Sequence, residues 1–257
     1  MNIDSELFRQ IAAAAAAETL PRFRNLDGVI NKLSSGFDPV TEADREAENA
    51  IRALITKHFP DHGILGEEHG TFNGSSSHIW VIDPIDGTRA FISGLPVWGT
   101  LVGLTVDKRA VAGMMSQPFT GELFYADETG AFYEGPGGAR NLQVRRTTAL
   151  SDATLFTTTP VMFKGELRAR FDALEAQVRL SRYGVDCYAF AMLAAGQVDI
   201  VVECGLQPYD IVALIPIIEK AGGVITNFDG ERAEAGGSVI AAATPELHRA
   251  ARHILAG

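Results

Sequence analysis

Residues 80–91 read Trp-Val-Ile-Asp-Pro-Ile-Asp-Gly-Thr-Arg-Ala-Phe, an apolar run that leads directly into two carboxylates, Asp83 and Asp86. The apolar run is typical of a buried strand, and Pro84 and Gly87 are residues that interrupt regular structure. We therefore expect both acids on a tight loop at the end of the strand. Carboxylate oxygens are ligands that Mg²⁺ prefers, and backbone N–H groups near a glycine can bind a phosphate. The stretch predicts a metal and phosphate site.

Composition limits the remaining possibilities. The chain has 257 residues, of which 46% are hydrophobic, enough for one large domain or for two halves that share a core. Its formal net charge of −10 argues against nucleic acid and against an anionic membrane as partners, because both are bound through clustered Lys and Arg. An anionic small substrate would therefore depend on metal ions.

Cysteine and histidine usage gives no competing site. Cys187 and Cys204 form no CxxC motif, which favours reduced, structural thiols over a zinc site or a disulfide. The histidines form no ligand-spaced pair near the acidic residues and are expected to be surface or packing residues. The start of the chain has no basic leader, and no apolar run approaches the roughly 18 residues of a membrane span, so we expect a cytoplasmic protein.

The first half of the chain indicates helices followed by a sheet. Apolar spacing predicts a helix over residues 3–20, and Thr41 followed by Asp44 resembles a capping box that starts a second helix, which runs to Pro60. A short strand should end at Glu67 and Glu68, beside the strand at 79–82. Short turn-linked runs within residues 97–134 predict an antiparallel meander.

Beyond about residue 150 the pattern changes to alternating strands and helices. Strands are expected near 153–158, 179–183, 198–203, 223–226 and 238–242, with helices near 165–177, 186–195, 210–221 and from 245 onward. No Pro/Ser-rich linker separates the halves. We therefore interpret residues 1–257 as one catalytic domain of the α/β class, with sheets and helices in layers, whose halves meet near residues 148 and 149.

Acidic residues recur where elements end: Glu67, Asp83, Asp86 and Asp210. Each alone could be a helix cap or a solvated turn. The Asp-Pro-Ile-Asp-Gly-Thr segment is harder to explain in that way, because the carbonyl of Ile85 lies between two carboxylates. If the four acids meet, they repel one another unless cations are present, which predicts a Mg²⁺-dependent site suited to phosphoester hydrolysis.

These motifs resemble the inositol monophosphatase superfamily of Mg²⁺-dependent phosphatases. The resemblance extends over nearly the whole chain and rests on four segments in family order: Asp38-Pro39-Val40-Thr41-Glu42-Ala43-Asp44, Gly66-Glu67-Glu68, Trp80 to Thr88, and Tyr209-Asp210 followed by Ala221-Gly222-Gly223. It implies a five-layered α/β/α/β/α sandwich of the inositol monophosphatase and fructose-1,6-bisphosphatase type, and commonly a homodimer.

The same resemblance implies a set of metal ligands. Glu67, Asp83 and the carbonyl of Ile85 would hold one Mg²⁺, and Asp83, Asp86 and Asp210 would hold a second. A third, weaker ion would depend on Glu67. Two to three Mg²⁺ ions would then occupy each active site.

The resemblance also implies how water and phosphate are handled. The Thr88 hydroxyl, oriented by Asp44, would help to deprotonate the attacking water, with Glu67 as a further catalytic residue. The backbone N–H groups of Gly87 and Thr88 would bind the phosphate. Lys32 and Asp38 match outer positions of the family less securely.

Two segments differ from the inositol type. The motif continues Arg89-Ala90-Phe91 where inositol phosphatases have Thr-Asn-Phe, and Tyr209 stands where Trp is usual. Both differences, together with residues 184–191 and 201–210, resemble the histidinol-phosphate phosphatase branch. Asp186 and Glu203 could bind an ammonium-bearing alcohol. They could instead be a helix N-cap and an ordinary strand-end acid.

The roles of other residues near this motif have more than one interpretation. Arg89 could contact the phosphate, contact water on the imidazole side of the substrate, or simply cover its loop with its stem. Phe91 and Trp98 are expected in the core or at an interface.

The first hypothesis is therefore a phosphatase that hydrolyses L-histidinol phosphate, a small phosphate monoester of histidine biosynthesis. Within the same chemistry, the alternatives are an inositol-1-phosphatase or a broader sugar-phosphate or nucleotide-phosphate phosphatase. A non-catalytic regulatory or assembly module is a further alternative, against which the complete set of acids speaks.

Overall fold

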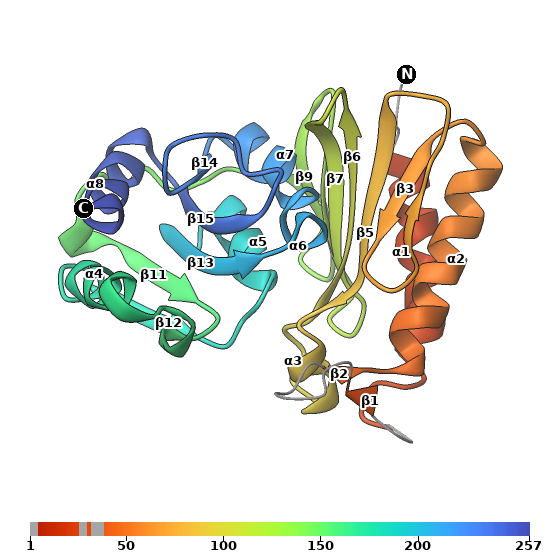
Figure 1. The fold of residues 1–257 in the computed structure, drawn as a ribbon, viewed down its shortest axis with the longest axis horizontal. Coiled ribbons are helices and arrows are strands. Elements are labelled where there is room, and N and C mark those ends of the chain that lie inside the picture. The colour runs from red at the N-terminus through yellow and green to blue at the C-terminus, as the bar shows by residue number, and fades with distance from the viewer. Residues whose placement is uncertain (1–4, 26–29, 32–38) are drawn as a thin grey trace.

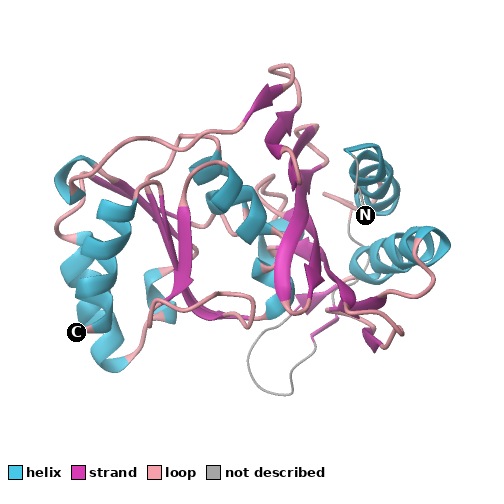
Figure 2. Cartoon of the chain, turned by 90° about the horizontal axis from the view of Figure 1, so that it is seen from above, coloured by secondary structure: helices cyan, strands magenta, loops and turns pink. Residues whose placement is uncertain are grey.

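The computed structural model describes residues 5–25, 30–31 and 39–257, so Lys32 and Asp38 lie outside the described residues. Five layers follow one another: two helices, a large sheet, a central helical layer, a smaller sheet and a second outer helical layer (Figure 1). The view from above shows the two sheets separated by the central helices (Figure 2). This is the predicted five-layered α/β/α/β/α sandwich.

The first helical layer consists of α1 (Ser5–Thr19) and α2 (Glu42–His58). The alanine run of α1 allows the two helices to pack closely, and both cover one face of the large sheet. The expected capping box starts α2, because Asp44 at its third position accepts hydrogen bonds from the Thr41 N–H (2.8 Å) and hydroxyl (2.5 Å). The sequence prediction of both helices is confirmed.

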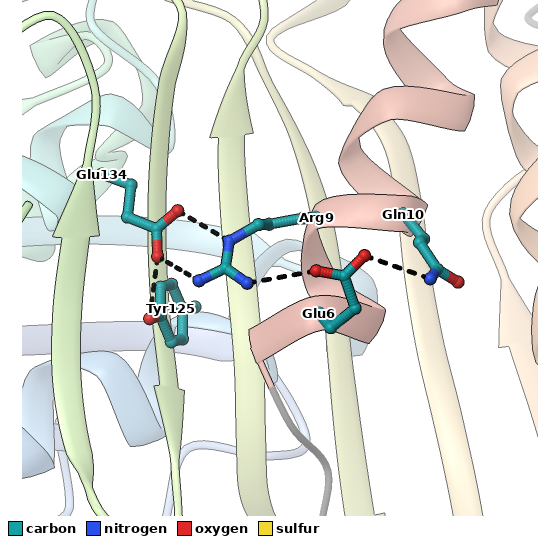
Figure 3. Close-up of polar contacts among 5 residues, drawn as sticks. All are labelled: Glu6, Arg9, Gln10, Tyr125 and Glu134. Atoms are coloured by element: carbon teal, nitrogen blue, oxygen red, sulfur yellow. Dashed lines mark hydrogen bonds and ion pairs between the residues drawn. The ribbon is translucent and has the colours of Figure 1, made fainter.

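A network of polar side chains joins α1 to strands of the large sheet that carry Tyr125 and Glu134 (Figure 3). The Arg9 guanidinium makes two hydrogen bonds to the Glu134 carboxylate, at 2.9 and 2.8 Å, and one to Glu6 at 3.3 Å. Tyr125 donates its hydroxyl to the same Glu134 carboxylate at 3.0 Å. The bidentate contact therefore adds a polar link between α1 and the sheet to the apolar contacts that they share.

The large sheet has eight strands in the order β10-β9-β8-β7-β6-β5-β3-β4. All neighbours are antiparallel except β3 and β5, which are parallel, so the predicted meander is confirmed. Its strands are β3 (Gly63–Gly66), β4 (Gly70–Phe72), β5 (His78–Asp86), β6 (Gly99–Val106), β7 (Arg109–Gln117), β8 (Glu122–Asp127), β9 (Gly130–Glu134) and β10 (Arg140–Asn141). The short strands β1 (Ile30–Asn31) and β2 (Pro39–Val40) pair separately, and α3 (Thr88–Ile92) follows β5.

The central layer contains α5 (Tyr188–Ala194), α6 (Pro208–Ile211) and α7 (Leu214–Lys220). One continuous helix was predicted over 210–221, and that prediction is wrong. Pro216 has no N–H to donate to the carbonyl of Val212, so the helix is interrupted before α7. The junction lies against the large sheet, where a Cβ on Gly113 would come within 2.3 Å of the Ala213 carbonyl oxygen.

The smaller sheet has the strand order β12-β11-β13-β15-β14. The first three strands are parallel, and β15 is antiparallel to both of its neighbours. The strands are β11 (Thr154–Thr157), β12 (Leu180–Tyr183), β13 (Ile200–Leu206), β14 (Val224–Asn227) and β15 (Gly237–Ala242); the outer helices are α4 (Gly165–Glu175) and α8 (Pro245–Ala256); and the short 3-10 turns are η1 (Leu150–Asp152) and η2 (Pro160–Met162). Among the described residues, no helix combines the length and apolarity that crossing a membrane requires.

Candidate metal and phosphate site

Asp83 and Asp86 lie at the end of β5, within the strand rather than on the tight loop that was predicted. The strand continues because Asp83 pairs with Leu101 of β6 and Asp86 pairs with Gly99, so three steps on β5 match two on β6. The extra residue is a β-bulge. In a regular strand, residues three apart point to opposite faces, so the bulge is what allows both carboxylates to face the same site.

Side-chain contacts hold the bulge together. The Asp83 carboxylate accepts the Ile85 N–H at 3.0 Å, and Thr100 donates its hydroxyl to the Pro84 carbonyl at 2.8 Å. The Ile85 side chain is fully buried in an aromatic cluster with Phe91. The segment therefore keeps its shape through contacts on both sides of the strand.

Asp210 reaches the same point from the second half of the chain. It lies in α6, where its carboxylate accepts the Gln207 N–H at 2.7 Å in a capping box. One carboxylate oxygen each from Asp83, Asp86 and Asp210 lie within 4.8 Å of one another. Such a group of hard oxygen donors fits Mg²⁺.

A cavity of about 350 Å³ contains this cluster and most of the predicted metal and phosphate residues. Glu67 follows β3 and is held beside β5 by a hydrogen bond from its N–H to the Ile82 carbonyl at 3.1 Å. The cavity is lined by Glu67, Asp83, Ile85, Asp86, Gly87, Thr88, Gln207, Tyr209 and Asp210. The fold thus brings together residues that are up to 143 positions apart, from Glu67 to Asp210.

The electrostatics of the cluster are those of a site that needs a cation. Burial, followed by repulsion from Glu67, Asp86 and Asp210, raises the pKa of Asp83 well above its ordinary value. Burial and the neighbouring acids also raise the pKa of Asp86 well above its ordinary value, and burial raises that of Asp210 to about 6. Without a cation these acids therefore keep their protons to higher pH than ordinary carboxyl groups do, and a bound metal ion would displace those protons.

Gly87 and Thr88 form the start of α3. Gly87 has a φ of +83°, and a Cβ there would lie 3.0 Å from the Cβ of Asp186, so a larger residue would be both strained and crowded. Thr88 donates its hydroxyl to the Ile85 carbonyl at 3.2 Å. Both Gly87 and Thr88 line the cavity.

Asp44 makes its described hydrogen bonds to Thr41, so its predicted pairing with Thr88 stays a prediction. Burial raises the pKa of Asp44 to about 6; the bonds from Thr41 oppose this, and Glu67 and Glu68 add to it. The other oxygen of Asp44 is buried and has no hydrogen-bond partner among the residues that the structure describes. An ionised Asp44 would therefore respond to charge in the metal site.

A second cavity of about 340 Å³ shares Asp86, Gly87, Thr88 and Asp210 with the first. Asp186, Glu203 and the exposed Arg89 all line it, and their substrate role stays a prediction. Thr158, Met162, Cys187, Phe190, Cys204, Gly205 and Leu206 complete its wall. Both cysteines are unbridged, as predicted.

Asp186 does not start a helix, contrary to prediction. α5 starts at Tyr188 after Cys187, and Asp186 precedes it with a left-handed φ of +43°. The Cys187 N–H donates to Asp86 at 2.7 Å, which ties this turn to the acidic cluster. Burial raises the pKa of Asp186 to about 6, and the charge of Arg89 opposes the shift.

Glu203 lies within β13, not at its end, because the strand continues past an irregularity to Leu206. One carboxylate oxygen accepts the Thr158 N–H at 2.5 Å, whereas the other is buried without a hydrogen-bond partner in the described part of the chain. Burial raises the pKa of Glu203 to about 8, opposed by the Thr158 bond and increased by Asp186 and Asp210. One oxygen of this carboxylate thus receives no hydrogen bond from the described residues.

Sequence analysis missed Gln207 and Thr158. The Gln-x-x-Asp spacing before α6 was a readable capping signal for Gln207. Thr158 had no such signal, because its contact with Glu203 joins strands that are 45 residues apart. Phe91 and Trp98 are fully buried and pack edge to face, which confirms that they belong to the core.

Comparison with known proteins agrees with this geometry. The model of the inositol monophosphatase family matches residues 2–256. The chain belongs to the inositol monophosphatase family. Because this is a family of phosphatases, the protein is a phosphoric monoester hydrolase, and the resemblance inferred from the motifs is confirmed.

The relatives of this inositol monophosphatase family member are named as different phosphatases. It is 38% identical to the bifunctional phosphatase IMPL2, chloroplastic, of Arabidopsis thaliana, over 96% of this chain and 75% of that protein. It is 34% identical to a histidinol-phosphatase of Chlorobaculum parvum, over 97% and 95%. An inositol monophosphatase from Zymomonas mobilis superposes with a TM-score of 0.85 at 36% identity, covering 98% of this chain and 97% of that one.

Replacing Asp83 by Asn should reduce phosphate-ester hydrolysis by more than about 100-fold, because the substitution removes a negatively charged ligand from the cluster. The amide oxygen can still accept the Ile85 N–H, and repulsion within the cluster falls. The metal-free variant should therefore be at least as stable as the wild type. Phosphate release and urea unfolding measure the two effects, with Asp172→Asn, an exposed substitution, as the control. Retained activity would rule out the metal role of Asp83.

The raised pKa of Glu203 predicts a pH-dependent stability in protein treated with a chelator. Between its ordinary value of 4.5 and about 8, the unfolded chain loses this proton while the folded chain keeps it, so stability falls as pH rises. Glu203→Gln removes this loss. Its unfolding free energy relative to the wild type should grow by on the order of 1 kcal/mol per pH unit across this window. A difference that does not change with pH would contradict the prediction.

Proposed function

We propose that the protein is a Mg²⁺-dependent phosphatase that hydrolyses L-histidinol phosphate to L-histidinol and phosphate. The observation that carries this proposal is the buried, unpartnered oxygen of Glu203, which lies with Asp186 on the cavity next to the acidic cluster. A phosphate bound at the cluster would place its leaving alcohol in that cavity. The alcohol would then meet two carboxylates.

The buried Glu203 carboxylate and the partly buried Asp186 carboxylate favour a cationic leaving group. A buried acceptor without a donor is unfavourable, and an ammonium group supplies three donors and the opposite charge. Its presence would return both Glu203 and Asp186 to the ionised form, against the burial that now raises their pKa values. The amino group of histidinol meets this requirement, whereas a neutral polyol offers only hydroxyl donors.

The two cavities would divide the reaction between them. Asp83, Asp86 and Asp210, together with Glu67 and the Ile85 carbonyl, would hold Mg²⁺. When bound there, the metal activates a water molecule and neutralises charge on the phosphoryl group. The backbone N–H groups of Gly87 and Thr88 would bind phosphate oxygens, and Arg89 at the rim adds positive charge to the neighbouring cavity.

Thr88 and Asp44 would move the proton of the attacking water. The Thr88 hydroxyl, which now donates to the Ile85 carbonyl, would turn toward the water and take its proton while giving its own hydroxyl proton to Asp44. Asp44, whose pKa burial raises to about 6, would take the hydroxyl proton. A pKa closer to neutrality suits a carboxylate that accepts a proton and later releases it.

The relatives support two substrates within this chemistry. The histidinol-phosphatase of Chlorobaculum parvum covers nearly the whole chain, which favours histidinol phosphate. The inositol monophosphatase of Zymomonas mobilis covers it equally well, so inositol 1-phosphate is the second candidate. Carboxylates can also accept hydroxyl groups, and substrate kinetics must therefore separate the two.

A phosphate-release screen with Mg²⁺ tests the substrate directly. We expect the highest kcat/KM for histidinol phosphate among histidinol phosphate, inositol 1-phosphate, fructose 1,6-bisphosphate and adenosine 3′,5′-bisphosphate. A higher kcat/KM for inositol 1-phosphate than for histidinol phosphate would contradict the proposed substrate. Equal turnover of all four would indicate a broad phosphatase.

Charge-neutral variants test the ammonium contact. Asp186→Asn and Glu203→Gln should each lower kcat/KM for histidinol phosphate by roughly 30-fold or more, because each removes one partner of a buried charge pair. The loss for 4-nitrophenyl phosphate, which has no ammonium group, should be much smaller, so the ratio of the two kcat/KM values falls. Asp172→Asn should leave this ratio unchanged. An equal loss for both substrates would show that the two acids do not recognise the ammonium group.

A further inference from the structure

Glu48, outside both cavities, holds the turn that carries Glu67. Its side chain is fully buried in α2, and its carboxylate points at the turn that follows β3. One oxygen accepts the Glu68 N–H at 2.7 Å, and the other accepts the His69 N–H at 3.2 Å and the Arg52 Nε at 2.7 Å. The carboxylate is therefore shared between a backbone turn and a guanidinium group.

The whole turn is tied at successive residues. A Cβ on Gly66 would lie 2.0 Å from the Glu48 carboxylate, so only glycine leaves room for it. Arg52 also donates to the Gly70 carbonyl, at the far end of the turn. Glu67 itself donates its N–H to β5. One ion pair thus spans the segment from Gly66 to Gly70.

Simple packing between α2 and β3 does not require such an arrangement. A buried ion pair loses solvation, and apolar residues of similar volume often hold two elements together as well or better. What a carboxylate alone supplies here is a pair of acceptors for the two N–H groups directly after Glu67. Residues that orient a metal ligand in this way change cation affinity when they are removed.

We propose that Glu48, supported by Arg52, is a positioning residue for the metal site: it fixes the backbone that presents Glu67 to Asp83 and Asp86. This inference rests on the proposed metal role of Glu67 and does not depend on which phosphate ester is hydrolysed. Loss of Glu48 should weaken cation binding while leaving the fold intact. Hydrolysis should then recover as the Mg²⁺ concentration is raised, so kcat at saturating metal changes less than the metal requirement.

The test is direct titration of the full chain with Mn²⁺, followed by electron paramagnetic resonance of the unbound ion. Glu48→Gln should weaken Mn²⁺ binding by about 10-fold to 100-fold. Arg52→Gln keeps Glu48 and should weaken binding in the same direction, so it provides the answer if Glu48→Gln does not fold. Asp199→Asn is the matched control, because Asp199 is equally buried and accepts the Thr154 N–H and an Arg145 contact in the smaller sheet.

The outcomes separate a positioning role from a structural one. Weaker Mn²⁺ binding in the two variants near Glu67, with wild-type affinity in a comparably destabilised Asp199→Asn, supports the inference. Unchanged affinity in a folded Glu48→Gln, or an equal loss in Asp199→Asn, overturns it. Because Mn²⁺ binding is measured without substrate, its result does not depend on whether the protein hydrolyses histidinol phosphate.

Discussion

The site depends on how closely the α6–α7 junction approaches the large sheet. Gly103 and Gly113 lie on neighbouring strands, and neither has space for a Cβ: the nearest atoms of Ala213 would be 2.7 and 2.3 Å away. These two glycines let the central helical layer rest directly on the strands. That contact brings Asp210 from the second half of the chain to Asp83 and Asp86 from the first.

The acidic side chains that this contact brings together affect the protonation and the hydrogen bonding of the site. Burial raises the pKa values of the clustered acids and mutual repulsion adds to it, so without a metal these acids keep their protons to higher pH than usual. The N–H groups of Ile85, Cys187 and Gln207 each donate to one of these carboxylates. A bound cation would replace the protons, whereas the backbone donors keep the carboxylates in position beforehand.

Two other buried carboxylates, those of Glu48 and Glu203, differ in how many of their oxygens accept hydrogen bonds from the protein. Both oxygens of Glu48 are satisfied by protein donors, which is the state of a group that holds a turn. Among the described residues, a donor reaches only one oxygen of Glu203; the other oxygen is buried, and the residue lines a cavity. Glu48 thus serves to hold the backbone, whereas Glu203 keeps one oxygen that could still accept a hydrogen bond.

The sequence by itself determined most of the helices, the antiparallel meander, the order of the acidic motifs and the family, because these follow from local periodicity and from short motifs that are contiguous in the chain. Tertiary structure decided the rest. The bulge between Asp83 and Asp86 exists only through pairing with β6, and Pro216 was visible but its effect on the helix was not anticipated. The backbone of Asp186 is left-handed where a helix start was expected. The hydrogen bond from Cys187 to Asp86 joins residues that are 101 positions apart. The partners of Glu203 and Glu48 likewise come from other elements. Such contacts depend on how whole layers pack, which no local pattern encodes.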